Sequence, residues 1–275
     1  PRWSPFRPVL SAILFDPREA AASGRLGPGQ TRVYPVALSD QAGGAELHIT
    51  ALANMSSFLE PDAEVFGRYR KKGAHARVVQ SDRVPVERLD ALAKADEFQP
   101  HILKVDTQGS ELMVLKGAEE SLQSVLLAEI EVSFFQRYVG QPLFADIESW
   151  MKQQGFELIE LHRLKRYRAA NSLDIRSSPM GDGQRSGRVA YGDAIFVRNE
   201  DAVQAAATTD GGASLLRAAI ALLAYGKADH AAALLDRGRN LLPAERMAAV
   251  TEALTALNRW RFVPRIAGLL KRSRS

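Results

Sequence analysis

The chain has 275 residues with a formal net charge of +4, 46% hydrophobic and 25% charged, which suits one α/β domain with an appendage. The absence of cysteine excludes disulfides, thiolate metal ligands and a cysteine nucleophile, and favours a reducing, cytoplasmic location. The five histidines are scattered and no apolar run approaches the roughly 20 residues that span a bilayer, so we expect neither a metal site nor a transmembrane segment.

The first third of the chain predicts short strands. We predict strands at residues 11–15, 31–38 and 45–51, an extended segment at 76–86, a short helix at 86–92, and a loop with a short helix at 54–72. The polar, Gly-rich residues 39–44 predict a hairpin between the second and third strands. Asp16-Pro-Arg-Glu19 is typical of a helix start with Asp16 as N-cap.

Residues 100–117 carry the most informative pattern. Ile102 to Val105 is a short apolar run between Pro100 and a Thr-Gln-Gly turn, which predicts a buried parallel strand. Ser110 is the predicted cap of a following amphipathic helix. Asp106 therefore lies just beyond the carboxyl end of a strand, where open α/β sheets bind ligands, although an Asp there can also simply stabilise the turn.

The next segments complete the predicted sheet. A buried strand is predicted at residues 125–132, a helix at 144–154 closed by Gly155, and an antiparallel strand pair at 156–161 and 189–197. Glu129 and Glu131 share a strand face, so one of them can be the buried partner of an Arg or Lys. The long basic insertion at 163–188 is either functional or a solvated loop. Residues 162–168, where the insertion begins, form a basic cluster. This cluster is either solvated or binds an anionic acceptor.

Alternating strands and helices followed by a terminal antiparallel pair predict an α/β sandwich with a mostly parallel sheet over residues 1–199. A linker is predicted at 200–212, and an α-helical hairpin extension with a basic tail at 213–275. The Ala- and Leu-rich pattern of this extension resembles one tetratricopeptide-type hairpin. A single repeat cannot form a solenoid, so we expect a packing or homodimerisation appendage.

The segment Leu103-Lys-Val-Asp-Thr-Gln-Gly-Ser-Glu-Leu-Met-Val-Leu-Lys-Gly-Ala118 resembles the signature of FkbM-type methyltransferases, which use S-adenosylmethionine. Phe15-Asp-Pro17, Val36-Ala-Leu-Ser-Asp40 and Glu131-Val-Ser-Phe134 resemble further motifs of the family in the same order. The resemblance covers about residues 1–198 and implies a Rossmann-like class I methyltransferase sandwich. The family's glycine-rich loop is not in the chain, and its strand would lie between the strands ending at Asp16 and Asp106. We therefore expect a longer natural protein, or another segment in that place.

The resemblance also implies roles for individual residues. Asp16 would bind the ribose hydroxyls of the cofactor, although it can equally cap a helix. Ala37, Leu38 and Asp40 would line the adenine, with turn formation as the alternative for Asp40. Asp106 would be the general base or orient the acceptor, and Glu131 would share that work, since two nearby carboxylates raise one pKa toward a useful value.

The function that follows is O-methylation of a hydroxyl on a sugar, a glycan or glycolipid, or a small metabolite. The acceptor can be anionic, and no nucleic-acid motif is present. Two alternatives remain open: another nucleotide-binding α/β enzyme such as a reductase, and a catalytically impaired methyltransferase-like interaction module.

Overall fold

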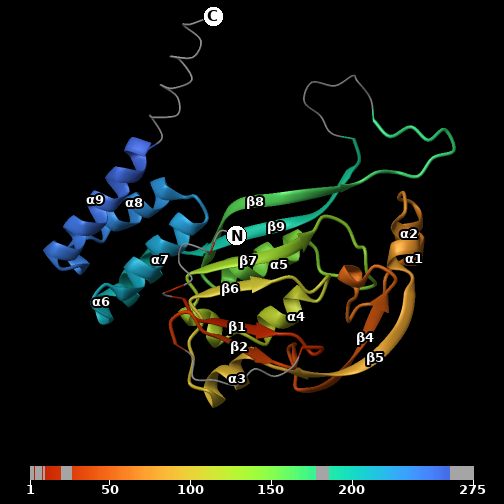
Figure 1. Ribbon diagram of the computed structural model, residues 1–275, viewed down its shortest axis with the longest axis horizontal. Coiled ribbons are helices and arrows are strands. Elements are labelled where there is room, and N and C mark those ends of the chain that lie inside the picture. The colour runs from red at the N-terminus through yellow and green to blue at the C-terminus, as the bar shows by residue number, and fades with distance from the viewer. Residues whose placement is uncertain (1–2, 4–7, 9, 20–26, 178–185, 261–275) are drawn as a thin grey trace, which may run out of the picture. The chain divides into compact units, whose positions relative to one another are not determined.

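The computed structural model describes residues 3, 8, 10–19, 27–177 and 186–260, except for the side chains of 257–260. Two compact units make up the chain (Figure 1). The first ends at Arg198 and is α/β, and the second begins at Asn199 and is helical. No helix in the described ranges combines the length and apolar character that crossing a membrane requires.

The first unit contains short helices and strands of very different lengths. Its strands are β1 (Ala12–Phe15), β2 (Thr31–Tyr34), β3 (Ala37–Leu38), β4 (Gly43–Thr50), β5 (Val78–Glu87), β6 (Ile102–Val105), β7 (Leu127–Ser133), β8 (Phe156–Tyr167) and β9 (Arg188–Arg198). Its helices are α1 (Ala63–Gly67), α2 (Lys72–Ala76), α3 (Leu89–Ala95), α4 (Glu111–Lys116) and α5 (Phe144–Gln153), with 3₁₀ turns η2 (Ala53–Met55) and η3 (Ser121–Ser124). The predicted strand at 102–105 is confirmed residue for residue, and the helix predicted at 144–154 is confirmed within one residue. A helix follows Ser110 as predicted, but it ends at Lys116, before Leu122, which the predicted helix was to carry.

The described strands form a two-stranded sheet β1-β2, a three-stranded sheet β3-β5-β4 and a four-stranded sheet β6-β7-β9-β8. The pairs β1–β2, β3–β5 and β6–β7 are parallel, whereas β4–β5, β7–β9 and β8–β9 are antiparallel. The predicted terminal antiparallel pair is confirmed, but a mostly parallel sheet is not, because the sheets are mixed. The long strands β5, β8 and β9 pair as antiparallel ribbons, which adds antiparallel ladders to the short parallel ones.

The predicted hairpin between residues 31–38 and 45–51 is wrong. β4 pairs with β5, from Gly43 opposite Val86 to Thr50 opposite Val78, and β5 lies between β3 and β4. The turn at residues 39–42 therefore joins two strands that are not hydrogen-bonded neighbours. The predicted extended segment at 76–86 supplies the strand that both of them pair with.

β1 and β6 belong to different sheets, and among the described strands each pairs on one side only. Phe15 of β1 packs against the main core. After β1, residues 16–19 form a turn in which Arg18 N donates to Asp16 Oδ1 at 2.9 Å. The rest of the helix predicted to start there lies outside the described residues. Asp16 and Asp106 thus follow strands of separate sheets.

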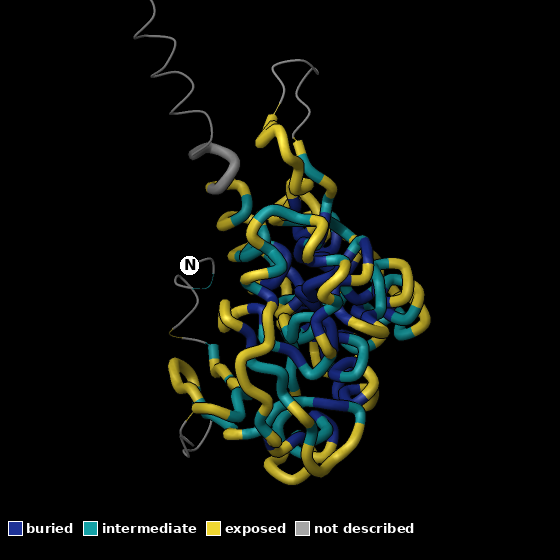
Figure 2. Tube along the Cα trace, turned by 90° about the vertical axis from the view of Figure 1, so that its right-hand side faces the viewer, coloured by how far each residue is buried: buried dark blue, intermediate teal, exposed yellow. Residues whose placement is uncertain are grey.

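The main core lies on one face of the four-stranded sheet. Its strand members are Leu103, Val105, Ala128, Ile130, Val132, Phe156, Ala194 and Phe196. Leu115 of α4 and Ile147 and Met151 of α5 pack in the same cluster, and each fully buried side chain of this size contributes roughly 1.5–3 kcal/mol. Since side chains alternate along a strand, Glu129 and Glu131 lie on the opposite face. Figure 2 shows the buried stretches in the interior and exposed ones on the turns.

Gly117 allows the end of α4 to contact the segment after β3. A Cβ at this position would lie 1.9 Å from the carbonyl oxygen of Ser39. We expect Gly117→Ala to lower the free energy of unfolding by about 1–3 kcal/mol, because the backbone must shift to admit the methyl group. Urea denaturation measures this. The control is Gly67→Ala, whose Cβ meets nothing within 4 Å; an equal loss in both variants would contradict the steric argument.

The second unit is built from α6 (Glu200–Thr209), α7 (Ala213–Ala224), α8 (Ala228–Arg237), the 3₁₀ turn η4 (Arg239–Leu241) and α9 (Ala244–Trp260). The segment predicted as a linker is mostly helical, because Asn199 caps α6 by accepting a hydrogen bond from Ala202 N at 2.9 Å. α7 and α8 form the predicted helical hairpin and bury Leu215, Leu222 and Leu234. The basic tail at 261–275 lies outside the described residues.

Candidate active site

The parallel pairing of β6 and β7 brings two predicted catalytic carboxylates together. Val105 is the register partner of Ile130, so Asp106 and Glu131 follow these residues at the same edge of the sheet. The Asp106 side chain is 43% exposed, whereas that of Glu131 is 6% exposed. One carboxylate of the pair is thus open to solvent and the other is enclosed.

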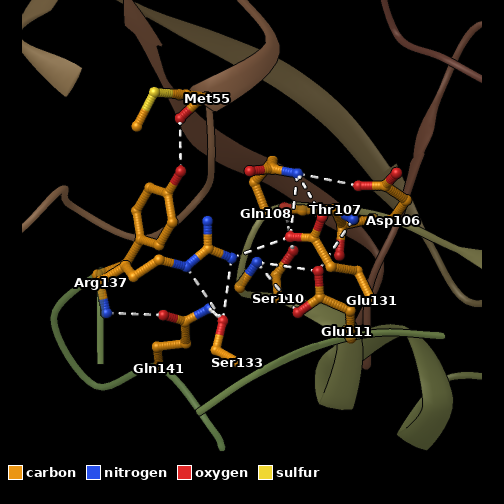
Figure 3. Close-up of polar contacts among 12 residues, drawn as sticks. Met55, Asp106, Thr107, Gln108, Ser110, Glu111, Glu131, Ser133, Arg137 and Gln141 are labelled. Carbon is orange, nitrogen blue, oxygen red and sulfur yellow. Dashed lines mark hydrogen bonds and ion pairs between the residues drawn. The ribbon is translucent and has the colours of Figure 1, made fainter. Parts of the chain in front are cut away.

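Gln108 joins the two carboxylates. Its amide Nε2 lies 2.9 Å from Asp106 Oδ1 and 3.1 and 3.2 Å from the two Glu131 oxygens (Figure 3). The residue has a φ of 56°, in the left-handed region that residues with a Cβ rarely adopt. The strained backbone places the amide between Asp106 and Glu131, which links them through one donor.

Glu111, the first residue of α4, holds this turn in place. Its buried carboxylate accepts hydrogen bonds from Thr107 N at 3.0 Å and from Gly109 N at 2.9 and 3.0 Å. Ser110 is the N-cap residue of α4, as predicted, but its hydroxyl makes no capping hydrogen bond and instead donates to the Thr107 carbonyl at 3.4 Å. Burial raises the pKa of Glu111, while the backbone donors oppose that shift. Nothing in the composition of the turn distinguished Glu111 from an ordinary first-turn acid.

Arg137 is the buried partner of Glu131, and the sequence did not indicate it. Its guanidinium is 1% exposed and Nη2 lies 2.9 Å from Glu131 Oε1 and 2.9 Å from Ser133 Oγ (Figure 3). Gln141 completes the network, since its Oε1 accepts from Arg137 N at 2.9 Å and its Nε2 donates to Ser133 Oγ at 2.8 Å. The signal that could have identified Arg137 is its position in the sequence, where it stands among aromatic residues in a buried stretch.

Burial sets the protonation of Glu131. It raises the pKa of this carboxyl to about 7; Arg137 opposes the shift, and the nearby Asp106 and Glu111 carboxylates add to it. A carboxyl with a pKa near neutrality can take up or release a proton at working pH, as a general base requires.

We expect this pKa to appear in the pH dependence of stability. Folded Glu131 keeps its proton to about pH 7, whereas an unfolded Glu loses it near 4.5, so the folded state holds more protons between these values. Its contribution is therefore complete below pH 4.5 and is lost as pH rises to about 7, by roughly 3 kcal/mol. Denaturant unfolding at several pH values, for the wild type and Glu131→Gln, measures the difference in slope. Identical slopes in this window would contradict the assignment.

Glu129, which lies on the same face of β7 as Glu131, has a partner of its own. Lys104 Nζ lies 3.4 Å from Glu129 Oε1 and 3.7 Å from Asp106 Oδ2. The sequence predicted that one of the two β7 glutamates can be the buried partner of a Lys or Arg. Glu129 fits that prediction. It holds for Glu131 as well, which pairs with Arg137. Tyr138 is fully buried and its hydroxyl donates to the Met55 carbonyl at 2.9 Å.

The predicted cofactor residues lie on other strands. Asp16 follows β1, and Ala37 and Leu38 form β3, paired with Val86 and Glu87 of β5. Within the described residues, no hydrogen bond or ion pair joins these positions to Asp106 or Glu131.

Two side chains near the strand ends bear on ligand binding. Asp40 Oδ1 accepts a hydrogen bond from Ser39 Oγ at 3.2 Å. Thr107 Oγ1, beside Asp106, is buried and makes no hydrogen bond within the described part of the chain. No set of three or more His, Asp or Glu in the described ranges is arranged to hold a metal ion.

Together, the mixed α/β unit and the acids beyond its parallel strands are those of a methyltransferase-type α/β domain. The chain matches the model of the methyltransferase FkbM domain over residues 11–158, more than half of its 275 residues. It therefore belongs to the FkbM methyltransferase family, and the resemblance seen in the sequence is confirmed. Searches of curated proteins and of solved structures found no match.

Proposed function

We propose that the protein is an S-adenosylmethionine-dependent O-methyltransferase with a Rossmann-like catalytic domain, acting on a hydroxyl of a sugar, a glycan or glycolipid, or a small metabolite. The observation that carries the proposal is the linked pair Asp106 and Glu131, one exposed and one enclosed, at the end of parallel strands. Transfer to a hydroxyl requires a group that removes its proton, and this pair supplies it.

The roles of the two acids follow from their exposure. Asp106 accepts the hydrogen bond of the acceptor hydroxyl and orients its oxygen. The proton passes to one of the two carboxylates. Gln108 keeps the carboxylates at a fixed separation, and Arg137 neutralises the charge of Glu131.

The residues predicted to bind the cofactor offer a carboxylate and an apolar surface, which S-adenosylmethionine can use. S-adenosylmethionine, when bound, supplies the methyl group from its sulfonium. The Asp16 carboxylate would hold the ribose hydroxyls, and the apolar Ala37 and Leu38 with Asp40 would bind the adenine. Thr107 Oγ1 offers a further hydrogen-bonding group near Asp106. Alignment of acceptor and donor is the largest contribution expected of such a site.

Calorimetry of the protein with S-adenosylmethionine tests the cofactor, and NAD serves as the comparison ligand. We expect a saturable heat with S-adenosylmethionine alone. Absence of heat at millimolar ligand would favour a non-catalytic interaction module, and heat with NAD alone would favour a reductase. A labelled-methyl assay on glycan and lipid fractions then identifies the acceptor class.

A further inference from the structure

The chain just after β8 carries the two most exposed large apolar side chains of the described residues. Leu173 is 76% exposed and Ile175 is 61% exposed. Asn171 fixes the turn that holds them, because its Nδ2 donates to the Ile175 carbonyl at 2.9 Å and its Oδ1 accepts from Ile175 N at 3.0 Å. The turn therefore presents two aliphatic side chains to solvent in a defined position.

Two basic segments that are far apart in the sequence meet at the base of this turn (Figure 1). Tyr69 and Ala169 form an antiparallel β-bridge, closed by two backbone hydrogen bonds of 3.0 and 2.9 Å. The bridge joins residues 68–72, Arg-Tyr-Arg-Lys-Lys, to the end of residues 162–168, His-Arg-Leu-Lys-Arg-Tyr-Arg. Neither segment contains an acidic residue, so their meeting concentrates positive charge.

Most of this charge faces solvent. The nearby acids are already paired, since Glu64 binds Arg68 and Asp174 binds both Arg70 and Arg176. Within the described part of the chain, five exposed cations of the region make no ion pair: Lys71, Lys165, Arg166, Arg168 and Arg188. We call residues 68–72, 163–176 and Arg188 the basic surface. Its excess of positive charge attracts anions over a longer range than a single contact does.

The basic surface lies at the same edge of the sheet as Asp106. Ser133, the last residue of β7, is opposite Tyr191 of β9, and the β8–β9 ladder continues past this point to the pair Tyr167 and Arg188. Since β6 and β7 are parallel, the end of β7 marks the edge at which Asp106 lies. The basic surface therefore extends beyond the candidate active site at that edge.

We propose that the basic surface docks on an anionic lipid membrane, with Leu173 and Ile175 inserted at the level of the lipid headgroups. A membrane uses both features of the surface, because interfacial binding grows with the apolar area buried and with the attraction of Lys and Arg to anionic lipid. A nucleic acid would use the cations alone, since aliphatic side chains cannot stack on bases as aromatic rings do.

Membrane docking itself does not depend on the proposed function. What it adds to that function is the acceptor class, and for this step it rests on the proposed function. A glycolipid would be presented by the membrane to the edge of the sheet at which Asp106 lies.

Co-sedimentation of the full chain with lipid vesicles tests the proposal. We expect binding to vesicles of phosphatidylcholine and phosphatidylserine in equal parts, and at least tenfold weaker binding to phosphatidylcholine alone. Leu173→Ser and Ile175→Ser should each weaken binding to the mixed vesicles by about tenfold, because each removes a side chain that the membrane buries. The matched control is Leu158→Ser, at the opposite end of β8, where the side chain is 39% exposed; it should bind as the wild type does.

The same assay measures the contribution of charge. Lys165→Gln and Arg168→Gln should each weaken binding to the mixed vesicles by about fivefold, and added sodium chloride should weaken it further. Lys152→Gln, at an exposed position of α5 just before β8 begins, should have no effect. Circular dichroism confirms that the variants are folded.

Equal binding to both kinds of vesicle, or unchanged binding of the two apolar variants, would overturn the proposal. Tight binding to a random-sequence DNA duplex by those same apolar variants would assign the surface to nucleic acid instead. The assay contains no S-adenosylmethionine, so its result is independent of catalysis. Vesicle binding by a protein that fails to bind S-adenosylmethionine would refute the proposed function and leave the membrane surface standing, and the converse result would refute only the membrane surface.

Discussion

Replacing Arg137 with methionine is expected to lower the free energy of unfolding by about 3–5 kcal/mol at pH 8, which would be the largest stability loss of any substitution considered for this protein. The reason is that Glu131 would lose the guanidinium that lies 2.9 Å away in the wild type and holds its pKa down, so at pH 8 the enclosed carboxyl must either keep an unpaired charge or take up a proton. At pH 5.5 we expect a clearly smaller loss, because burial keeps Glu131 protonated below a pKa of about 7. Urea denaturation at the two pH values measures both.

The control for this prediction is Arg163→Met. Arg163 is 57% exposed and lies 3.7 Å from Asp193, so its loss should cost less than about 1 kcal/mol. Adding Glu131→Leu to Arg137→Met should recover part of the stability, since an apolar pair replaces an unpaired charge. A loss that is the same at both pH values, or a double variant no better than the single one, would show that Arg137 acts only through packing.

The strand–turn–helix at residues 102–116 could be predicted because its signals are local. Alternation of apolar residues, the turn composition and the helix periodicity all lie within a few residues of each other. The adjacency of Asp106 and Glu131 also followed, since parallel neighbours end at the same edge of a sheet. The partner of β4 could not be predicted in this way, because strand pairing depends on β5, which lies far along the chain.

The support of the site depends on tertiary contacts that residue type does not reveal. Gln108 adopts a left-handed backbone only because Glu111 binds the amides on both sides of it. Arg137 is buried because Glu131 and Ser133 offer it acceptors, whereas an isolated arginine in a sequence is usually exposed. The helix α6 replaced a predicted linker because alanine favours a helix once Asn199 caps it.

Asp106→Asn is expected to reduce the rate of methyl transfer by 10²–10⁴-fold, roughly the contribution of a positioned general base, while leaving S-adenosylmethionine affinity within about twofold. The amide cannot take up the proton, yet it keeps the size of the side chain and one oxygen for Gln108. Single-turnover rates with a labelled cofactor measure the chemical step, and calorimetry measures binding. Glu157→Gln, at an exposed position of β8, is the control. A parallel fall in affinity and rate would instead assign Asp106 to cofactor binding.

Glu131→Gln separates the second carboxylate from the first by its effect on pH dependence. In the wild type the rate should rise as pH increases through about 7, because Glu131 must lose its proton before it can accept one from the hydroxyl. Without the Glu131 charge, this rise should disappear or move to a lower pH. If the wild-type profile is flat between pH 6 and 8 while Asp106→Asn remains inactive, Glu131 stabilises the site without taking part in proton transfer. The comparison thus decides between two roles for Glu131 and Arg137. Either they take part in proton transfer together with Asp106, or they only hold Asp106 in position.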